Sequence, residues 1–165
     1  MPATVLPPTI RAANDGERRW FFGGGVHTWK ATAEETGGAF LLFEDQMVRG
    51  KATPLHTHPE SDETMYMLDG EILMHMDGQE HVVGTGGLVV APRGVPHAFL
   101  VTSETARMLC LHTPGACQDF YLDASEPLRS SSDGSTHEVD FERIQQSAQR
   151  HGGIELLGPP PFGRP

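Results

Sequence analysis

One stretch of the chain sets two histidines, a glutamate and two glycines at fixed spacings: Gly50-Lys-Ala-Thr-Pro-Leu-His56-Thr-His58-Pro-Glu-Ser-Asp-Glu63-Thr-Met-Tyr-Met-Leu-Asp-Gly70. Side chains two residues apart on a β-strand project to the same face, so His56 and His58 point the same way. Inside a barrel, each unpaired imidazole would cost about 1–3 kcal/mol. A divalent metal removes that cost, because neutral imidazole is its commonest protein ligand. Glu63, at the start of the next expected strand, can add a carboxylate oxygen.

A second stretch, Gly86 to Val101, supplies a third histidine. Pro92 and Gly94 predict a turn, and His97 opens the strand after it. Three histidines and one glutamate suit iron, manganese, nickel, cobalt, copper or zinc, and disfavour an all-oxygen calcium cage. The predicted ligands of one divalent transition metal per subunit are therefore His56, His58, Glu63 and His97.

Short apolar runs separated by glycine-containing turns surround these stretches. We expect strands over 26–32, 40–48, 63–68, 71–76, 81–83, 88–91, 97–101 and 106–112. Asp69-Gly70 and Asp77-Gly78 lie between such runs and predict hairpins, because glycine accepts the positive φ of tight turns. Many short strands at this spacing predict an antiparallel sandwich or small barrel, which explains the 19 glycines.

The two ends of the chain lack this pattern. We expect an N-terminal arm over residues 1–19, a barrel over 20–124 with its motif core at 40–113, and a loop, helix and tail over 125–165. The small polar residues 130–136 predict the loop. Asp140 to Arg150 predicts the helix, with Asp140 as N-cap and Gly152 as the stop.

Charge and composition exclude several classes of partner. The chain carries 12 Lys and Arg against 22 Asp and Glu, a formal net charge of −10, which argues against binding to nucleic acid or to an anionic membrane. The first residues show no signal-peptide pattern, and no apolar run approaches the length of a membrane span. Cys110 and Cys117 are expected to be reduced thiols. We therefore expect a cytoplasmic protein.

The two stretches resemble the two motifs of the cupin superfamily. The first matches at every motif position, and the second matches at Gly86, Pro92, Gly94 and His97, whereas Val101 stands where Asn is often found. The surrounding sequence resembles small single-domain cupins of the quercetin-dioxygenase-like kind. The resemblance implies an all-β fold, the antiparallel double-stranded β-helix or cupin jelly-roll barrel, here with a short C-terminal helix. It also implies a homodimer, for which residues 1–20 are a plausible exchange segment.

Strand parity extends the predicted site into a substrate pocket. Met65 and Met67 share the parity of Glu63, and Phe99 shares that of His97, so these three are expected to form an apolar wall, although ordinary core packing also explains them. If Arg107 points outward on its strand, His112 points inward and becomes a pocket candidate. Glu60 and Asp62 are expected to be solvated. The run Trp20 to Phe22 either caps the barrel mouth or covers a sheet.

The predicted chemistry follows from a metal held by three neutral histidines and one carboxylate. A substrate hydroxyl on such a metal loses its proton more readily, and Glu63 is the expected catalytic base. The first hypothesis is a dioxygenase that acts on a flavonol-like or other enolisable aromatic bound as its anion, as the resemblance implies. The alternatives are a non-redox metalloenzyme, such as a cyclase or isomerase, and a non-catalytic cupin that binds a metal or small molecule.

Overall fold

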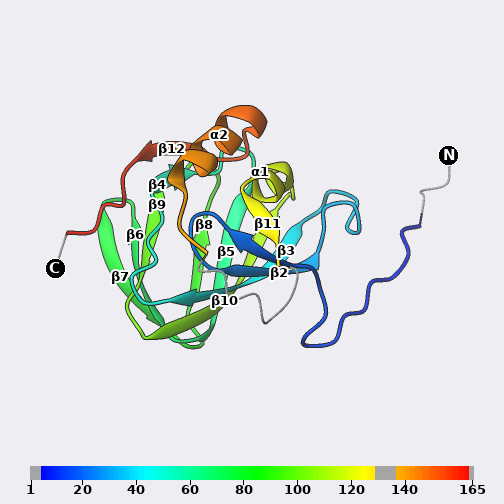
Figure 1. The fold of residues 1–165 in the computed structure, drawn as a ribbon, viewed down its shortest axis with the longest axis horizontal. Helices are drawn as coiled ribbons and strands as arrows, with labels where there is room; N and C mark the ends of the chain where they lie inside the picture. Colours follow the sequence, from blue (N-terminus) through cyan, green and yellow to red (C-terminus); the bar gives the residue numbers. More distant parts are fainter. Residues whose placement is uncertain (1–4, 129–136, 164–165) are drawn as a thin grey trace.

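Two antiparallel β-sheets form the framework of the computed structural model, which describes residues 5–128 and 137–163 (Figure 1). The strands are β1 (Arg18–Phe21), β2 (Val26–Ala31), β3 (Leu41–Val48), β4 (Leu55–Thr57), β5 (Asp62–Asp69), β6 (Glu71–Met76), β7 (Gln79–Gly84), β8 (Leu88–Ala91), β9 (His97–Val101), β10 (Thr105–Thr113), β11 (Ser125–Pro127) and β12 (Glu155–Gly158). One sheet has the order β11-β1-β2-β3-β10-β5-β8 and the other β12-β4-β9-β6-β7. The predicted all-β barrel is confirmed.

Alternation along β10 shows how the sequence fills the barrel. This strand lies between β3 and β5 in the seven-stranded sheet. Met108, Cys110 and His112 are buried, whereas Arg107 is exposed and lies 3.4 Å from Glu44 on β3. The inward orientation predicted for His112 is therefore confirmed.

The two Asp-Gly turns behave differently. Asp77-Gly78 joins β6 to β7 as a hairpin, and both residues have positive φ, of 52° and 73°. The hairpin predicted at Asp69-Gly70 is wrong, because β5 and β6 lie in different sheets. A Cβ atom on Gly70 would lie 2.3 Å from the carbonyl oxygen of Thr105, so this glycine is needed where the chain crosses closely between the sheets.

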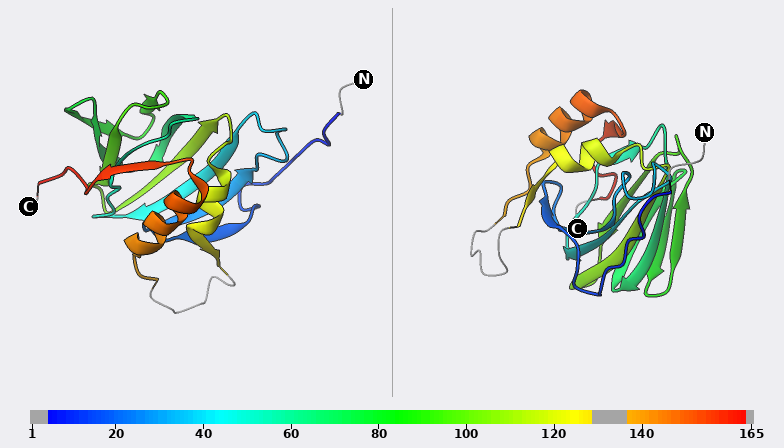
Figure 2. Two further views of the ribbon diagram at one scale, coloured as in Figure 1. Left: turned by 90° about the horizontal axis from the view of Figure 1, so that it is seen from above. Right: turned by 90° about the vertical axis from the view of Figure 1, so that its right-hand side faces the viewer.

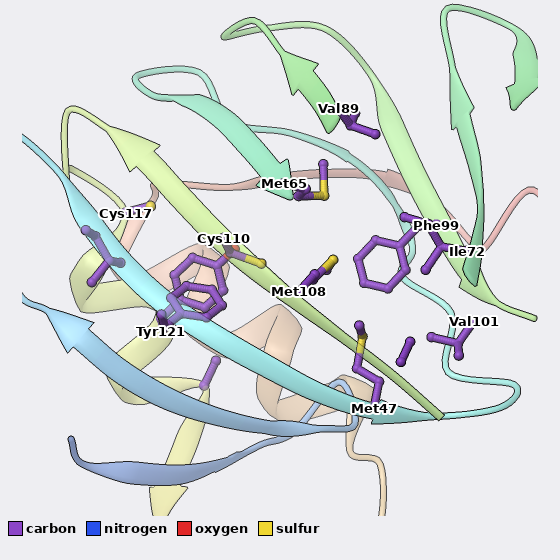
Figure 3. Close-up of a cluster of buried hydrophobic side chains, with 14 of the residues drawn as sticks. Met47, Met65, Ile72, Val89, Phe99, Val101, Met108, Cys110, Cys117 and Tyr121 are labelled. Atoms are coloured by element: carbon purple, nitrogen blue, oxygen red, sulfur yellow. The ribbon is translucent and has the colours of Figure 1, made fainter. Parts of the chain in front are cut away.

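The hydrophobic core lies between the two sheets. Figure 3 shows Met65 and Met108 from the seven-stranded sheet close to Phe99 from the other sheet. All three side chains are at most 5% exposed. Cys110 and Cys117 are buried free thiols, as expected.

Two helices lie together on one side of the β-structure (Figure 2). Helix α2 (Phe141–His151) confirms the predicted helix: the Asp140 side chain accepts a hydrogen bond from the backbone N–H of Arg143, and Gly152 follows the last turn. Helix α1 (Gln118–Asp123) was not predicted from the sequence. Among the described residues, no helix is long and apolar enough to cross a membrane.

The segments outside the predicted barrel contribute to both sheets. Strand β11 extends the seven-stranded sheet beside β1, and β12 pairs with β4 in the other sheet. Within the described part of the arm, Arg11 forms an ion pair with Glu35 at 2.6 Å, whereas Val5 and Ile10 are more than 90% exposed. The predicted loop at 130–136 lies outside the described residues.

Candidate metal centre

Strands from both sheets bring the four predicted ligands together. His56 is on β4 and His58 directly follows that strand, Glu63 is on β5, and His97 is on β9, where it pairs with His56 across the ladder. One nitrogen or oxygen atom from each of the four lies within 4.8 Å of those of the others, and all four side chains are buried. The turn predicted at Pro92 and Gly94 supports this arrangement, because the Gly94 N–H donates to the His58 carbonyl at 2.9 Å.

Backbone carbonyls orient the three imidazole rings. The Nδ1 atoms of His56, His58 and His97 lie 2.8, 2.8 and 2.9 Å from the carbonyl oxygens of Pro54, Gly153 and Val95. A carbonyl only accepts hydrogen bonds, so each Nδ1 carries the proton and each Nε2 is left with a free lone pair when the ring is neutral. Metal-binding histidines are held in the same way, because the bond at one nitrogen fixes the orientation of the other.

The donor atoms that would face a metal are poorly satisfied by protein alone. Glu63 Oε2 lies 2.8 Å from His97 Nε2 and 3.2 Å from His58 Nε2. The buried Nε2 of His58 nevertheless has no hydrogen-bond partner of acceptable geometry. A buried nitrogen without a partner costs about 1–3 kcal/mol, and a cation at this position would satisfy it. The four residues therefore fit a divalent transition metal in their chemistry and their geometry.

Burial and neighbouring charges set the protonation of the metal-free site. Burial lowers the pKa of His56 to about 3, with further lowering by His97 and His58, so this ring is neutral. Burial acts against ionisation of Glu63, but His112, His58 and His97 overcome it and hold the pKa of the carboxyl well below its ordinary value. Burial also opposes the charged form of His97, whose pKa is nevertheless raised by its hydrogen bond to Glu63. A metal would take the place of the proton on His97.

His112 lies behind Glu63 rather than among the side chains that line the cavity. Its Nε2 is 3.6 Å from Glu63 Oε1, and neither of its buried ring nitrogens has a hydrogen-bond partner. Burial lowers its pKa to about 3. His58, His112 and Cys117 form a second set of potential donor atoms within 4.8 Å of one another. His112 therefore lies next to the predicted ligands without being one of the four, and its role as a pocket residue stays a prediction.

A narrow cavity of about 50 Å³ leads to this cluster, with room for a few water molecules. Phe99 and Phe21 contribute to its wall. This supports the predicted place of Phe99 in the pocket and, of the two readings left open for the run Trp20 to Phe22, favours the barrel mouth for Phe21 alone. Met65 and Met67 lie in the hydrophobic core, outside this wall, and their role at a pocket stays a prediction. Phe141, Ile144 and Ile154 also line the cavity, so the C-terminal segment covers it.

The two acidic residues near the motif stay outside the site. Glu60 is exposed, and Asp62 binds Arg93, with its Oδ1 3.1 Å from the guanidinium Nε. Neither belongs to a group of potential metal ligands among the described residues. Both agree with the expectation from the sequence.

Sequence reasoning missed a second polar group on the cavity wall, formed by His27, Asp45 and Lys51. On β3, Asp45 alternates in phase with the buried residues Phe43 and Met47, so a charged residue lies on the core face of the strand. This alternation in the sequence could have indicated that Asp45 is buried. We call these three residues the polar cluster.

Comparison with known proteins shows what this arrangement resembles. Residues 44–112 match the family model of the cupin domain, so this part of the chain is similar to cupins. The chain is 27% identical over 150 residues to quercetin 2,3-dioxygenase of Bacillus subtilis (strain 168), a match that covers 90% of this chain and 44% of that protein. The chain thus spans less than half the length of this relative.

Solved structures share the fold at low sequence identity. KdgF from a Halomonas species has a TM-score of 0.59 and 16% identity, and the match covers 66% of this chain and 94% of that one. The polyketide cyclase RemF from Streptomyces resistomycificus has a TM-score of 0.52 and 20% identity, covering 78% and 89%. These similarities agree with the jelly-roll barrel predicted from the sequence.

Proposed function

We propose that this protein is a mononuclear metal-dependent dioxygenase that acts on a flavonol-like or other enolisable aromatic substrate, bound to the metal as its anion. The observation that carries the proposal is the cluster of His56, His58, Glu63 and His97, with each imidazole oriented by a backbone carbonyl. The 27% identity to a quercetin 2,3-dioxygenase supports the choice of reaction.

The metal, when bound, would supply a Lewis acid for a substrate oxygen and, if it is redox-active, a means of reaction with dioxygen. His56, His58 and His97 would hold it through their Nε2 atoms, and Glu63 would hold it through a carboxylate oxygen. Because the site is shared by cupins of many activities, the ligand set alone does not select the reaction.

Glu63 has the properties of a proton acceptor for the substrate hydroxyl. Its carboxylate is ionised, is 7% exposed at the side chain and lines the cavity. A general base must lie within hydrogen-bond reach of the proton it takes, and a substrate oxygen beside the cluster would meet this condition. His112, 3.6 Å from the other carboxylate oxygen, favours the ionised form of Glu63.

The rest of the cavity wall would bind an aromatic ring and exclude water. Phe21, Phe99, Phe120 and Tyr121 contribute to it. A cavity of about 50 Å³ is too small for a flavonol. We therefore propose that the side chains of Phe141, Ile144 and Ile154 move aside when the substrate enters.

Oxygen uptake by protein loaded with one metal at a time tests the proposal. Quercetin is added to the iron, manganese, nickel, cobalt and copper forms, and consumption of quercetin and dioxygen is followed together. We expect uptake with at least one metal and its loss in His56→Ala, with a matching loss of bound metal. Glu63→Gln should reduce turnover more than 100-fold. Glu60→Gln, which changes an exposed carboxylate three residues away, is the matched control.

Two results would count against the proposal. Absence of oxygen uptake with every redox-active metal would overturn dioxygenase activity on this substrate class. Conversion of an enolisable substrate by the zinc form without dioxygen would favour a cyclase or isomerase at the same site.

A further inference from the structure

The polar cluster of His27, Asp45 and Lys51 lies on the wall of the cavity that also reaches His56, Glu63 and His97. Its side chains are only 2%, 3% and 4% exposed. Nothing in the metal chemistry proposed above uses them. Charged residues are seldom buried to this extent unless they are paired, as Asp45 and Lys51 are here. What requires an explanation is the place of this pair on the cavity wall.

The cluster is held in place by neighbouring strands. His27 on β2 is directly opposite Asp45 on β3, and Lys51 Nζ lies 2.5 Å from Asp45 Oδ2. The His27 ring stacks between Phe21 and Phe43, with ring centroids 4.6 and 4.2 Å away. The Lys51 ammonium also lies 5.5 Å from the ring centroid of Phe99, which lines the same cavity. These contacts make the cluster a fixed part of the wall.

Two acceptor atoms in the cluster have no partner. Asp45 Oδ1 and His27 Nδ1 are buried and make no hydrogen bond. The Nε2 of His27 faces Asp45 Oδ2 at 3.6 Å, and a proton on Nε2 leaves Nδ1 with a free lone pair. Burial lowers the pKa of His27, so the ring is neutral. Burial opposes ionisation of Asp45, but Lys51 and His27 hold the pKa of its carboxyl below the ordinary value.

The charges in the cluster indicate which ligand group would satisfy these atoms. The Asp45 carboxylate and the Lys51 ammonium compensate each other, and the neutral His27 adds no charge. A ligand carboxylate or phosphate would be disfavoured, because it would face two hydrogen-bond acceptors and no net positive charge. A neutral hydroxyl can donate its proton to Asp45 Oδ1 or to His27 Nδ1 and so replace a bond that burial has removed.

We propose that the polar cluster is a specificity site that binds a hydroxyl group of the substrate other than the one held by the metal. This inference rests on the proposed function, because the metal is taken to hold another oxygen of the same molecule. It narrows the substrate class to enolisable aromatics that carry at least one further hydroxyl. Analogues that lack this hydroxyl would leave the two acceptors unpaired, and a site built around a hydroxyl discriminates strongly against such analogues.

The test uses matched pairs of metal-binding ligands that differ by one hydroxyl. A short pair is allomaltol and kojic acid, and a long pair is 3-hydroxyflavone and 3,7-dihydroxyflavone. Dissociation constants are measured by calorimetry on the zinc-loaded protein, so that binding is read without turnover. We expect the hydroxylated member of at least one pair to bind about tenfold more tightly.

Two variants locate the preference. Asp45→Leu with Lys51→Met replaces the ion pair by apolar side chains of similar size, a change that buried pairs often tolerate. His27→Phe keeps an aromatic ring in the stack and removes both nitrogen atoms, at the cost of a slightly larger ring. In both variants, the ratio of the two dissociation constants within a pair should come close to one. Zinc content and affinity for the member without the extra hydroxyl should stay as in the wild type. Glu44→Gln, on the outward face of β3 next to Asp45, is the control and should keep the preference.

The outcomes separate this inference from the proposed function. Equal affinity within both pairs for the wild type, or a preference that survives both folded variants, would overturn the specificity site while metal-anchored binding stands. If no member of either pair binds the zinc-loaded protein, the metal-anchored substrate of the proposed function fails and the specificity site fails with it. Loss of affinity for all ligands alike in folded variants would assign the cluster a purely structural role.

Discussion

Substitution of Gly153 by alanine should weaken both the fold and the metal site. Gly153 follows helix α2 and has a φ of +76°, and its carbonyl oxygen accepts the hydrogen bond from His58 Nδ1 at 2.8 Å. A Cβ atom there would lie 2.9 Å from Cys117 Cα and 3.1 Å from Cys117 Cβ. Backbone atoms cannot move aside as the end of a flexible side chain can, so residue 153 or helix α1 must shift.

The magnitude combines two costs. A left-handed conformation costs a residue with a Cβ about 1–2 kcal/mol, and overpacking against fixed atoms adds about 1–3 kcal/mol. We therefore expect a loss of about 3 kcal/mol, which lowers the melting temperature of a chain of this size by about 6–12 °C. Loss of the bond that orients His58 should also reduce metal affinity about 10- to 100-fold.

The neighbouring Gly152 provides the control. It also has a positive φ, of +66°, but a Cβ atom there meets nothing within 4 Å. Gly152→Ala should therefore incur only the cost of its backbone conformation, about 1–3 kcal/mol, and leave metal affinity unchanged. Thermal unfolding of the metal-free proteins measures the loss of stability, and competition for zinc against a chromophoric chelator measures the metal affinity. If Gly153→Ala matches Gly152→Ala in both measurements, the role assigned to this carbonyl is wrong.

Three further predictions concern pH, the cavity mouth and association. Because burial lowers the folded-state pKa of His112 to about 3 from 6.5, the unfolded chain binds more protons between these values. Through His112, the free energy of unfolding of the metal-free protein should fall by about 1.4 kcal/mol for each pH unit below pH 6. His112→Gln should make the free energy of unfolding in urea less steeply dependent on pH. An unchanged pH dependence would contradict the low pKa of His112. Ile144→Ala should lower stability by about 2–4 kcal/mol and speed ligand entry in stopped-flow binding, whereas Gln149→Ala on the exposed face should do neither. We predict a homodimer formed through the N-terminal arm, so Val5→Ser with Ile10→Ser should yield a monomer in light scattering; an 18 kDa species for the wild type would refute it.

Local sequence rules predicted the elements whose stability is local. The helix at Asp140 has its cap, its apolar face and its terminal glycine within a dozen residues, and it was found within one residue of its observed bounds. The hairpin at Asp77-Gly78 likewise needs only its own turn. Gly70 looks the same in sequence, but its close neighbour is Thr105 on a distant strand, so only the tertiary fold could show that it marks a crossing between sheets.

The unpredicted elements depend on contacts far along the chain. Helix α1 has six residues and no side-chain N-cap, and β11 and β12 are short edge strands that pair with β1 and β4. The motif spacing identified the four residues that the fold brings together as potential metal ligands. The bond from His58 to Gly153 could not be predicted, because it joins residues separated by 95 positions.

That separation has a consequence for the order in which the site is made during synthesis. The predicted ligands have all been translated by the time His97 is added, but the carbonyl that fixes His58 arrives only with Gly153. At about 5–20 residues per second, a nascent chain spends several seconds with all four donors translated and one of them, the His58 imidazole, not yet held by its carbonyl. In that interval it should exchange metal ions readily and retain one firmly only after the C-terminal segment has docked. Under the proposed function, the identity of the bound ion would then be set late in synthesis, when β12 pairs with β4.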